Sequence, residues 1–128
     1  MNIRELVAMA RKAQESSYSP YSNFKVGAAL KVSNGKVYTG TNIENSSYGL
    51  TICAERVAAF KAISDGETKF KYIVITGTGK GYIYPCGACL QVLAEFSDDL
   101  QVIITDENNN YKALGLHDLL PRVFKTGQ

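Results

Sequence analysis

The spacing of apolar and polar residues predicts a helix and a β-hairpin at the start of the chain. Residues 2–16 carry apolar side chains at helical spacing, and Asn2 with Glu5 three positions later is typical of a capped helix start. Residues 24–32 alternate between apolar and polar or small positions and lead into Asn34-Gly35, a strong hairpin signal. A return strand is therefore expected over residues 36–43.

After the hairpin, the pattern alternates between helical periodicity and short apolar runs that are typical of buried strands. The predicted elements are a helix at 53–64, a strand at 70–76, a helix at 86–96, a strand at 101–105, a short edge strand at 111–114 and a short helix at 116–120. This order predicts an α/β fold, a three-layer α-β-α sandwich with a mixed, roughly five-stranded sheet.

Composition and charge are those of one compact domain, expected over residues 1–128, with a core of normal size. The formal net charge is +2 with Lys and Arg scattered, which argues against a nucleic acid polymer as partner because phosphate binding leaves a basic stripe. The first residues form an amphipathic pattern and no apolar run reaches membrane-spanning length, so neither a signal peptide nor a membrane partner is expected. Three cysteines without a secretion signal predict reduced thiols in the cytoplasm.

Three cysteines and one glutamate stand at the starts of the two central helices. Cys86 and Cys89 are three apart, so their sulfurs face one side of a helix start and can share an ion, with Cys53 as third ligand. A catalytic zinc site has three protein ligands and an open position for water, whose pKa falls to roughly 7. Glu55, two residues past a ligand, is placed to take the proton. This pattern is typical of zinc-dependent nucleobase deaminases.

Other interpretations of the cysteines remain open. A CxxC pair also forms redox sites, and a structural zinc site would recruit a fourth ligand, for which His117 is the single histidine. If the two helix starts converge, their N–H groups and partial positive charge offset the charge of three thiolates. Arg56 is expected to hydrogen-bond the sulfurs, unless it is an ordinary exposed helix arginine.

Four stretches carry a wider resemblance: residues 20–30 (PYSNFKVGAAL), 40–45 (GTNIEN), 53–56 (CAER) and 85–91 (PCGACLQ). Over nearly its whole length the chain resembles the small, homotetrameric cytidine deaminases of pyrimidine salvage. The zinc motif alone would fit the wider deaminase superfamily, and residues 42–45 narrow the match to free nucleosides. The resemblance implies hydrolytic deamination of cytidine and 2′-deoxycytidine with release of ammonia, one zinc ion per subunit and Glu55 as proton shuttle.

The resemblance also implies substrate contacts outside the zinc motif. Asn42 and Glu44 would hold the ribose hydroxyls, which suits two side chains that leave one strand face. Phe24 would pack against the pyrimidine ring, and the backbone around Ala54 would read the base carbonyl. Taken by themselves, Glu44 is a solvated strand end and Phe24 a core residue of the first strand.

Tyr48 and Phe124 resemble residues that reach into the active site of a neighbouring subunit. Taken by themselves, Tyr48 is a loop tyrosine and Phe124 a C-terminal apolar anchor. Two positions depart from the family, which usually has Arg where this chain has Leu90 and a small residue where it has Tyr84. The alternatives to a cytidine deaminase are a deaminase of another small base or nucleoside analogue, an editor of bases in RNA or DNA, and a non-catalytic zinc-stabilised binding module.

Overall fold

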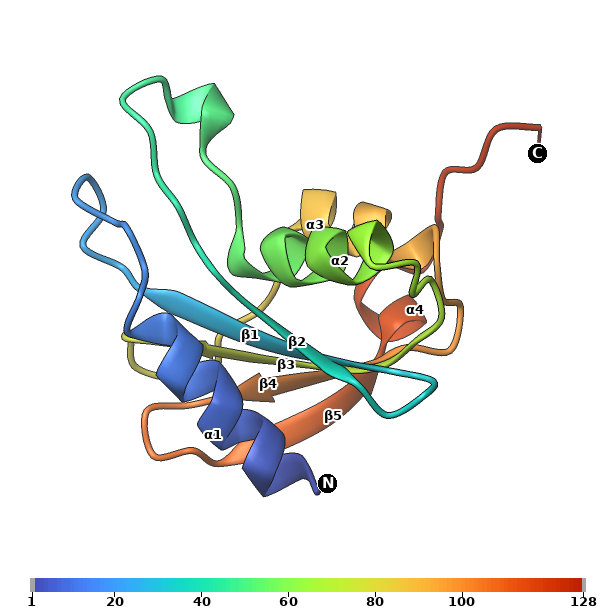
Figure 1. Cartoon of the computed structure of the whole chain (residues 1–128), viewed down its shortest axis with the longest axis horizontal. Coiled ribbons are helices and arrows are strands. Elements are labelled where there is room, and N and C mark those ends of the chain that lie inside the picture. Colours follow the sequence, from blue (N-terminus) through green and yellow to red (C-terminus); the bar gives the residue numbers. More distant parts are fainter. Residues whose placement is uncertain (1, 128) are drawn as a thin grey trace.

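A computed structural model describes residues 2–127, within which five strands form one mixed sheet between two layers of helices (Figure 1). The elements are α1 (Ile3–Gln14), β1 (Val26–Val32), β2 (Val37–Thr41), the 3-10 helix η1 (Tyr48–Leu50), α2 (Ala54–Ser64), β3 (Phe70–Gly77), α3 (Gly87–Ala94), β4 (Gln101–Thr105), β5 (Tyr111–Gly115) and α4 (Leu116–Leu119). The strand order is β2-β1-β3-β4-β5, with β3 and β4 parallel and the other neighbours antiparallel. The predicted three-layer sandwich and its mixed sheet are confirmed.

The two faces of the sheet are covered by different helices. On one face, α1 buries Leu6 and Ala10 against Val74 and Ile103 of the sheet. On the other face, α2, α3 and α4 cover alternate residues of the same strands, and this larger core includes Ile75. Because successive side chains of a strand point to opposite faces, one continuous apolar run fills both layers. Within residues 2–127, no helix combines the length and apolar character needed to cross a membrane.

The start of α2 is set by a close approach to β2. A Cβ atom on Gly40 would lie 2.4 Å from the carbonyl oxygen of Ala54 and 2.6 Å from the backbone nitrogen of Ala58. Ala54, Ala58 and Ala62 are fully buried, so small residues on both elements allow the helix to rest on the strand. This contact holds the first turn of α2, which carries the residues of the predicted zinc motif.

The hairpin strands are shorter than the alternation of residues predicts. Strand β1 begins at Val26, so Phe24 and Lys25 precede it, and β2 ends at Thr41. The Asn42 side chain bonds to the facing backbone at this point: its Oδ1 accepts from Val26 N–H at 2.9 Å, and its Nδ2 donates to the Phe24 carbonyl at 2.8 Å, while the Asn42 N–H donates to the Val26 carbonyl at 3.4 Å. A side-chain amide that bonds to the backbone in this way competes with strand pairing.

Candidate metal centre and active-site cavity

The three cysteine sulfurs meet between the starts of α2 and α3. Cys53 is the N-cap of α2, Cys86 is the N-cap of α3, and Cys89 lies in the first turn of α3. The three Sγ atoms lie within 4.8 Å of one another, and those of Cys86 and Cys89 are 3.6 Å apart. Zinc–sulfur bonds of about 2.3 Å place tetrahedral ligands about 3.8 Å apart, so three thiolates at this spacing fit one zinc ion.

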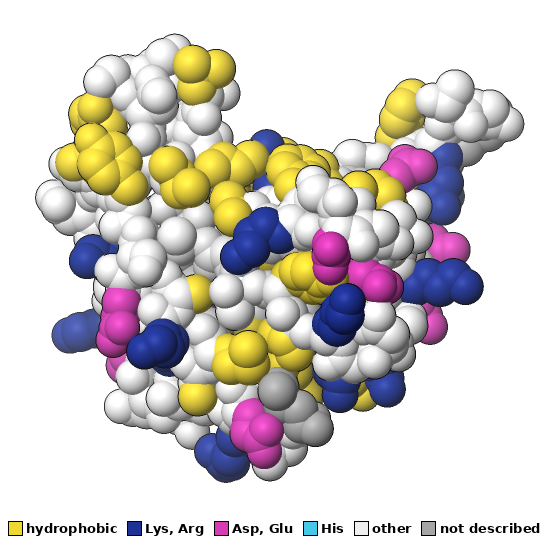
Figure 2. Space-filling model, viewed as in Figure 1, with side chains coloured by type: hydrophobic (Ala, Val, Ile, Leu, Met, Phe, Trp, Pro, Cys, Tyr) yellow, Lys and Arg dark blue, Asp and Glu magenta, His cyan; other side chains and the backbone are white. Residues whose placement is uncertain are grey.

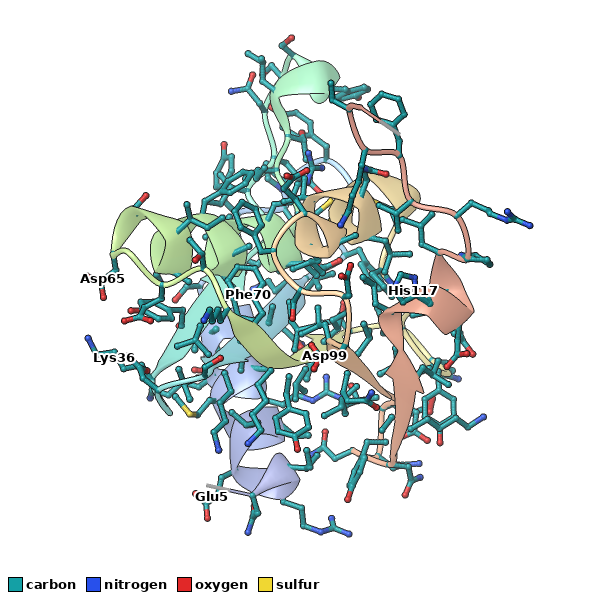
Figure 3. The ribbon with its side chains drawn as sticks, turned by 90° about the vertical axis from the view of Figure 1, so that its right-hand side faces the viewer. Glu5, Lys36, Asp65, Phe70, Asp99 and His117 are labelled. Carbon is teal, nitrogen blue, oxygen red and sulfur yellow. The ribbon has the colours of Figure 1, made fainter. Side chains whose placement is uncertain are left out.

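Among residues 2–127, the cysteine group does not include His117, which is exposed on α4 (Figure 3). A structural zinc site normally closes with four protein ligands, whereas a catalytic one keeps three and leaves a position for water. Cys86 is the exposed member of the group and Cys89 the buried one, so the ligands reach from the protein interior to a solvent-facing side. The donor set is therefore that of a catalytic site.

Positive charge surrounds the sulfurs. Both helices begin at a ligand, so the positive ends of their dipoles face the metal position. The Nη2 atom of Arg56 donates to the Cys53 sulfur at 3.3 Å, and this contact raises the pKa of the guanidinium. Leu90 is buried in the core beneath α3 and brings no charge to the site, so Arg56 is the cation in contact with the sulfurs among the described residues.

The thiols differ in their tendency to ionise. Hydrogen bonds from Cys89 and from Arg56 lower the pKa of Cys53 to about 5. The pKa of Cys89 is raised, because its sulfur shares a hydrogen bond with Cys53 and because it is buried. One thiolate therefore forms readily and discourages the next, so full ionisation of the group requires a cation between the sulfurs.

Glu55 is nearly enclosed, with 5% of its surface exposed, and it lines a cavity together with Cys53 and Cys86. Burial raises the pKa of Glu55 to about 7, and the charge of Cys53 adds to the rise. A carboxyl group with a pKa near neutrality can both accept and return a proton at physiological pH.

The cavity in front of the cysteines has a volume of about 220 Å³. It is lined by Phe24, Val26, Asn42, Thr51, Ile52, Cys53, Ala54, Glu55, Ile75, Ile83, Tyr84 and Cys86. Two of the predicted zinc ligands (Cys53 and Cys86), the proton shuttle and three of the predicted substrate residues thus share one cavity, and the third ligand, Cys89, is buried behind it. Thr51, Ile52 and Ile83 were not predicted, because isolated threonine and isoleucine residues beside a motif carry no chemical signal of their own.

Phe24 forms a wall of this cavity instead of belonging to the core of the first strand. Its ring rests on the end of β3 and on the loop that follows: a Cβ atom on Gly77, the last residue of β3, would lie 3.2 Å from it, and one on Gly79 in the loop would lie 2.7 Å from it. Tyr84 stands at the rim with 56% of its surface exposed. The position at which the resemblance expects a small side chain therefore adds an aromatic ring to the cavity.

Beyond the end of β2, Asn42 and Glu44 line two adjoining pockets that share Thr51. Asn42 uses its carbonyl oxygen and one N–H internally, and Ser17 also donates to that oxygen at 2.5 Å. Glu44 accepts from the backbone N–H groups of Tyr21 and Ser22 at 2.9 and 3.1 Å and from the Ser22 hydroxyl, which holds the pKa of Glu44 below its usual value.

Tyr48 and Phe124 do not line this cavity. Tyr48 is 75% exposed on η1, where its ring packs edge-on against Tyr21 at 5.9 Å between centroids. Phe124 is 71% exposed in the C-terminal segment. Figure 2 shows the loops and the C-terminal segment as two projections, with apolar side chains gathered on and between them.

Comparison with known proteins identifies the family. Residues 1–105 match the model of the cytidine and deoxycytidylate deaminase zinc-binding region. The chain is 45% identical over 125 residues to the cytidine deaminase of Sporosarcina psychrophila, covering 97% of this chain and 92% of that protein. It is 47% identical over 128 residues to the probable cytidine deaminase of Dictyostelium discoideum, covering 97% and 86%.

A solved structure agrees with the sequence relatives. The crystal structure of cytidine deaminase from Burkholderia pseudomallei superposes with a TM-score of 0.93 at 45% identity, covering 97% of this chain and all of that one (100%). The order of elements, the three sulfurs at two helix starts and these similarities together show that the chain belongs to the cytidine and deoxycytidylate deaminase family of zinc-binding proteins.

Proposed function

We propose that this protein is a zinc-dependent hydrolase that converts cytidine and 2′-deoxycytidine into uridine and 2′-deoxyuridine with release of ammonia. The observation that carries the proposal is that a buried carboxyl group, Glu55, lines one cavity with Cys53 and Cys86, whose sulfurs converge with that of the buried Cys89. The relatives named cytidine deaminase support the choice of substrate. We further propose that residues 1–128 act as one catalytic domain.

Cys53, Cys86 and Cys89 are the proposed zinc ligands. When bound, zinc lowers the pKa of a coordinated water to about 7 and so supplies hydroxide for attack on C4 of the base. Glu55 takes the proton released from that water and gives it to N3, which makes C4 electrophilic. Glu55 then takes the proton of the new C4 hydroxyl and delivers it to the amino group, which leaves as ammonia when the C4–N bond breaks, so that one water is consumed and one ammonia is released.

The cavity walls supply the proposed substrate contacts. Phe24 packs against the pyrimidine ring, and the backbone at Ala54 binds the base carbonyl. One Nδ2 hydrogen of Asn42 bonds to the Phe24 carbonyl, and the other is proposed to bind a ribose hydroxyl. Glu44 lies in the adjoining pocket and binds ribose as an ionised acceptor, for which the bonds from Ser22 and Tyr21 hold it in place.

We also propose a homotetramer in the cytoplasm, in which Tyr48 and Phe124 act in the active site of a neighbouring subunit. Large apolar side chains exposed beside the cavity support an assembly, because a monomer in water would leave them unpaired; Leu50 is 72% exposed on the same short helix as Tyr48. Sedimentation velocity of the zinc-loaded protein tests the assembly, and a single monomeric species at micromolar concentration would rule out shared sites.

The ultraviolet absorbance of cytidine, followed after mixing with zinc-loaded protein, tests the reaction. We expect a steady loss of the cytidine signal that stops when a chelator removes the metal. If cytidine is unchanged while zinc is bound, the substrate assignment is wrong, and Tyr84 at the cavity rim is the first position to exchange for serine.

Glu55→Ala tests the role of the carboxyl group. The variant should keep its zinc and its fold and lose at least about two orders of magnitude in kcat, in line with typical acid–base contributions. Zinc content and circular dichroism are the controls. An active Glu55→Ala variant would contradict the proposed proton transfers.

A further inference from the structure

The C-terminal segment, residues 121–127, projects from the molecule but is held at its base (Figure 1). The side-chain amide of Gln91 makes two hydrogen bonds to the backbone of Phe124: Nε2 donates to the Phe124 carbonyl at 2.9 Å, and Oε1 accepts from the Phe124 N–H at 3.4 Å. We call this pair of hydrogen bonds the bracket. One side chain thus occupies both backbone polar groups of a single residue. This contact is independent of the ring that residue 124 carries.

The bracket connects the segment to the helix that carries two of the zinc ligands. Gln91 lies on α3, two residues after Cys89. On either side of Phe124, Val123 packs against the larger core, and Lys125 forms an ion pair with Asp98 at 3.4 Å. The ion pair is exposed and contributes little to holding the segment, because surface pairs are screened by water. Gln91 is therefore the principal polar attachment of residue 124 among the described contacts.

We propose that Gln91 is a positioning residue that directs the Phe124 ring away from its own subunit and toward the active site of a second copy. The inference rests on the proposed function, in which Phe124 completes a neighbouring site. With the Phe124 backbone turned toward α3, its ring faces solvent, which explains an exposure of 71% in a segment whose backbone is bound. A ring held in advance loses less conformational freedom on docking than one on a loose segment.

Replacing Gln91 should weaken substrate binding without slowing the chemistry. Gln91→Met keeps the length of the side chain and removes both hydrogen bonds. We expect KM for cytidine to rise about tenfold, equivalent to about 1.4 kcal/mol. We expect kcat to stay within about twofold and zinc content to be unchanged, the pattern of a lost binding contact. Gln91→Asn, which keeps an amide but shortens its reach, should raise KM in the same way if the methionine variant folds poorly.

Two matched controls separate the bracket from general effects. Glu95→Gln alters an exposed residue directly after α3, and Lys125→Ala removes the exposed ion pair of the same segment. Both should leave KM within about twofold of the parent. Phe124→Ala should raise KM as Gln91→Met does. The KM of the double variant should be no higher than that of Phe124→Ala alone, because the effects of two substitutions that act through the same ring are not additive.

Mixed tetramers show in which subunit Gln91 acts. Co-expression of Glu55→Ala subunits, which lack the proton shuttle but keep the bracket, with Gln91→Met subunits produces hybrids. In these hybrids, intact catalytic sites of Gln91→Met subunits meet Phe124 rings presented by Glu55→Ala subunits. We expect the KM of the hybrids to fall back toward that of the parent protein.

Three results would overturn the inference, and they differ from a failure of the proposed function. If Gln91→Met keeps the KM of the parent protein while Phe124→Ala raises it, Phe124 acts in a shared site but the Gln91 hydrogen bonds do not position it. If the hybrids keep the high KM of the Gln91→Met protein, the substitution acts on the active site of the subunit that carries it and not on a neighbouring one. If Phe124→Ala keeps the KM of the parent protein, the ring takes no part in any active site. That result refutes both the shared site and the positioning role of Gln91.

Discussion

Arg56 is the side chain on which the charge balance of the cysteine cluster depends. Three thiolates and one zinc ion carry an excess negative charge, which the starts of α2 and α3 offset in part. The direct contact from Arg56 to Cys53, at 3.3 Å, adds a full positive charge. Position 90, where the resemblance leads us to expect Arg, holds a leucine that is 5% exposed and packs into the core. Among the described residues, the positive side-chain charge at the sulfurs is therefore concentrated on Arg56.

Arg56→Gln, which keeps a hydrogen-bond donor and removes the charge, should lower zinc affinity. We expect a loss of about 10–100-fold, the usual effect of removing a group that supports a metal ligand. Competition with a chromophoric chelator at fixed pH measures the affinity, and Arg4→Gln on the exposed surface of α1 serves as the control. Unchanged affinity would mean that the helix dipoles alone balance the thiolates.

At the scale of elements, the site depends on β2 and α2, which approach so closely at Gly40 that a larger side chain there would not fit. Gly40 of β2 faces the backbone of the first turn of α2, where Cys53 and Glu55 are found. Any side chain at this position meets backbone atoms, which cannot rotate away. The helix that carries half of the zinc motif is therefore placed by a glycine outside the motif.

Gly40→Ala should lower the free energy of unfolding by about 1–3 kcal/mol, the usual cost of overpacking a close contact. Because α2 must shift, zinc affinity should fall as well. Urea denaturation measures the stability. Gly49→Ala is the matched control, since a Cβ atom at Gly49 has nothing within 4 Å, and its stability should be close to that of the parent. Equal midpoints for the two variants would mean that the strand and helix can separate at little cost.

At the scale of the whole molecule, zinc connects two helices that are far apart in the sequence and share one core. Cys53 begins α2, whereas Cys86 and Cys89 belong to α3, so one ion bound by all three sulfurs ties the two helices together on one face of the sheet. A ligand that binds the folded state alone stabilises it by mass action, by about 4 kcal/mol when its concentration is a thousand times its Kd.

Removal of zinc should therefore lower the thermal unfolding midpoint by several degrees. Differential scanning calorimetry before and after dialysis against a chelator, with zinc content measured in parallel, tests this expectation. Cys86→Ser should unfold at a lower temperature than the parent and respond little to the chelator. A midpoint that does not move when the zinc has left would show that the ion does not contribute to the stability of the fold.

The amino-acid sequence by itself determined the features that depend on short spacings. The layers follow from apolar periodicity, and the positions of Cys53, Glu55, Cys86 and Cys89 follow from their places at helix starts, where a few residues set the direction of each side chain. The tertiary structure alone decided which distant groups meet. Examples are the ring of Phe24 on the loop after β3 and the Gln91 amide on the backbone of Phe124. It also decided that the Asn42 amide bonds to the backbone of Val26 and Phe24. Such contacts depend on packing and on backbone N–H and C=O groups. Because nearly every residue has these groups, a local sequence pattern does not indicate which of them a side chain will reach.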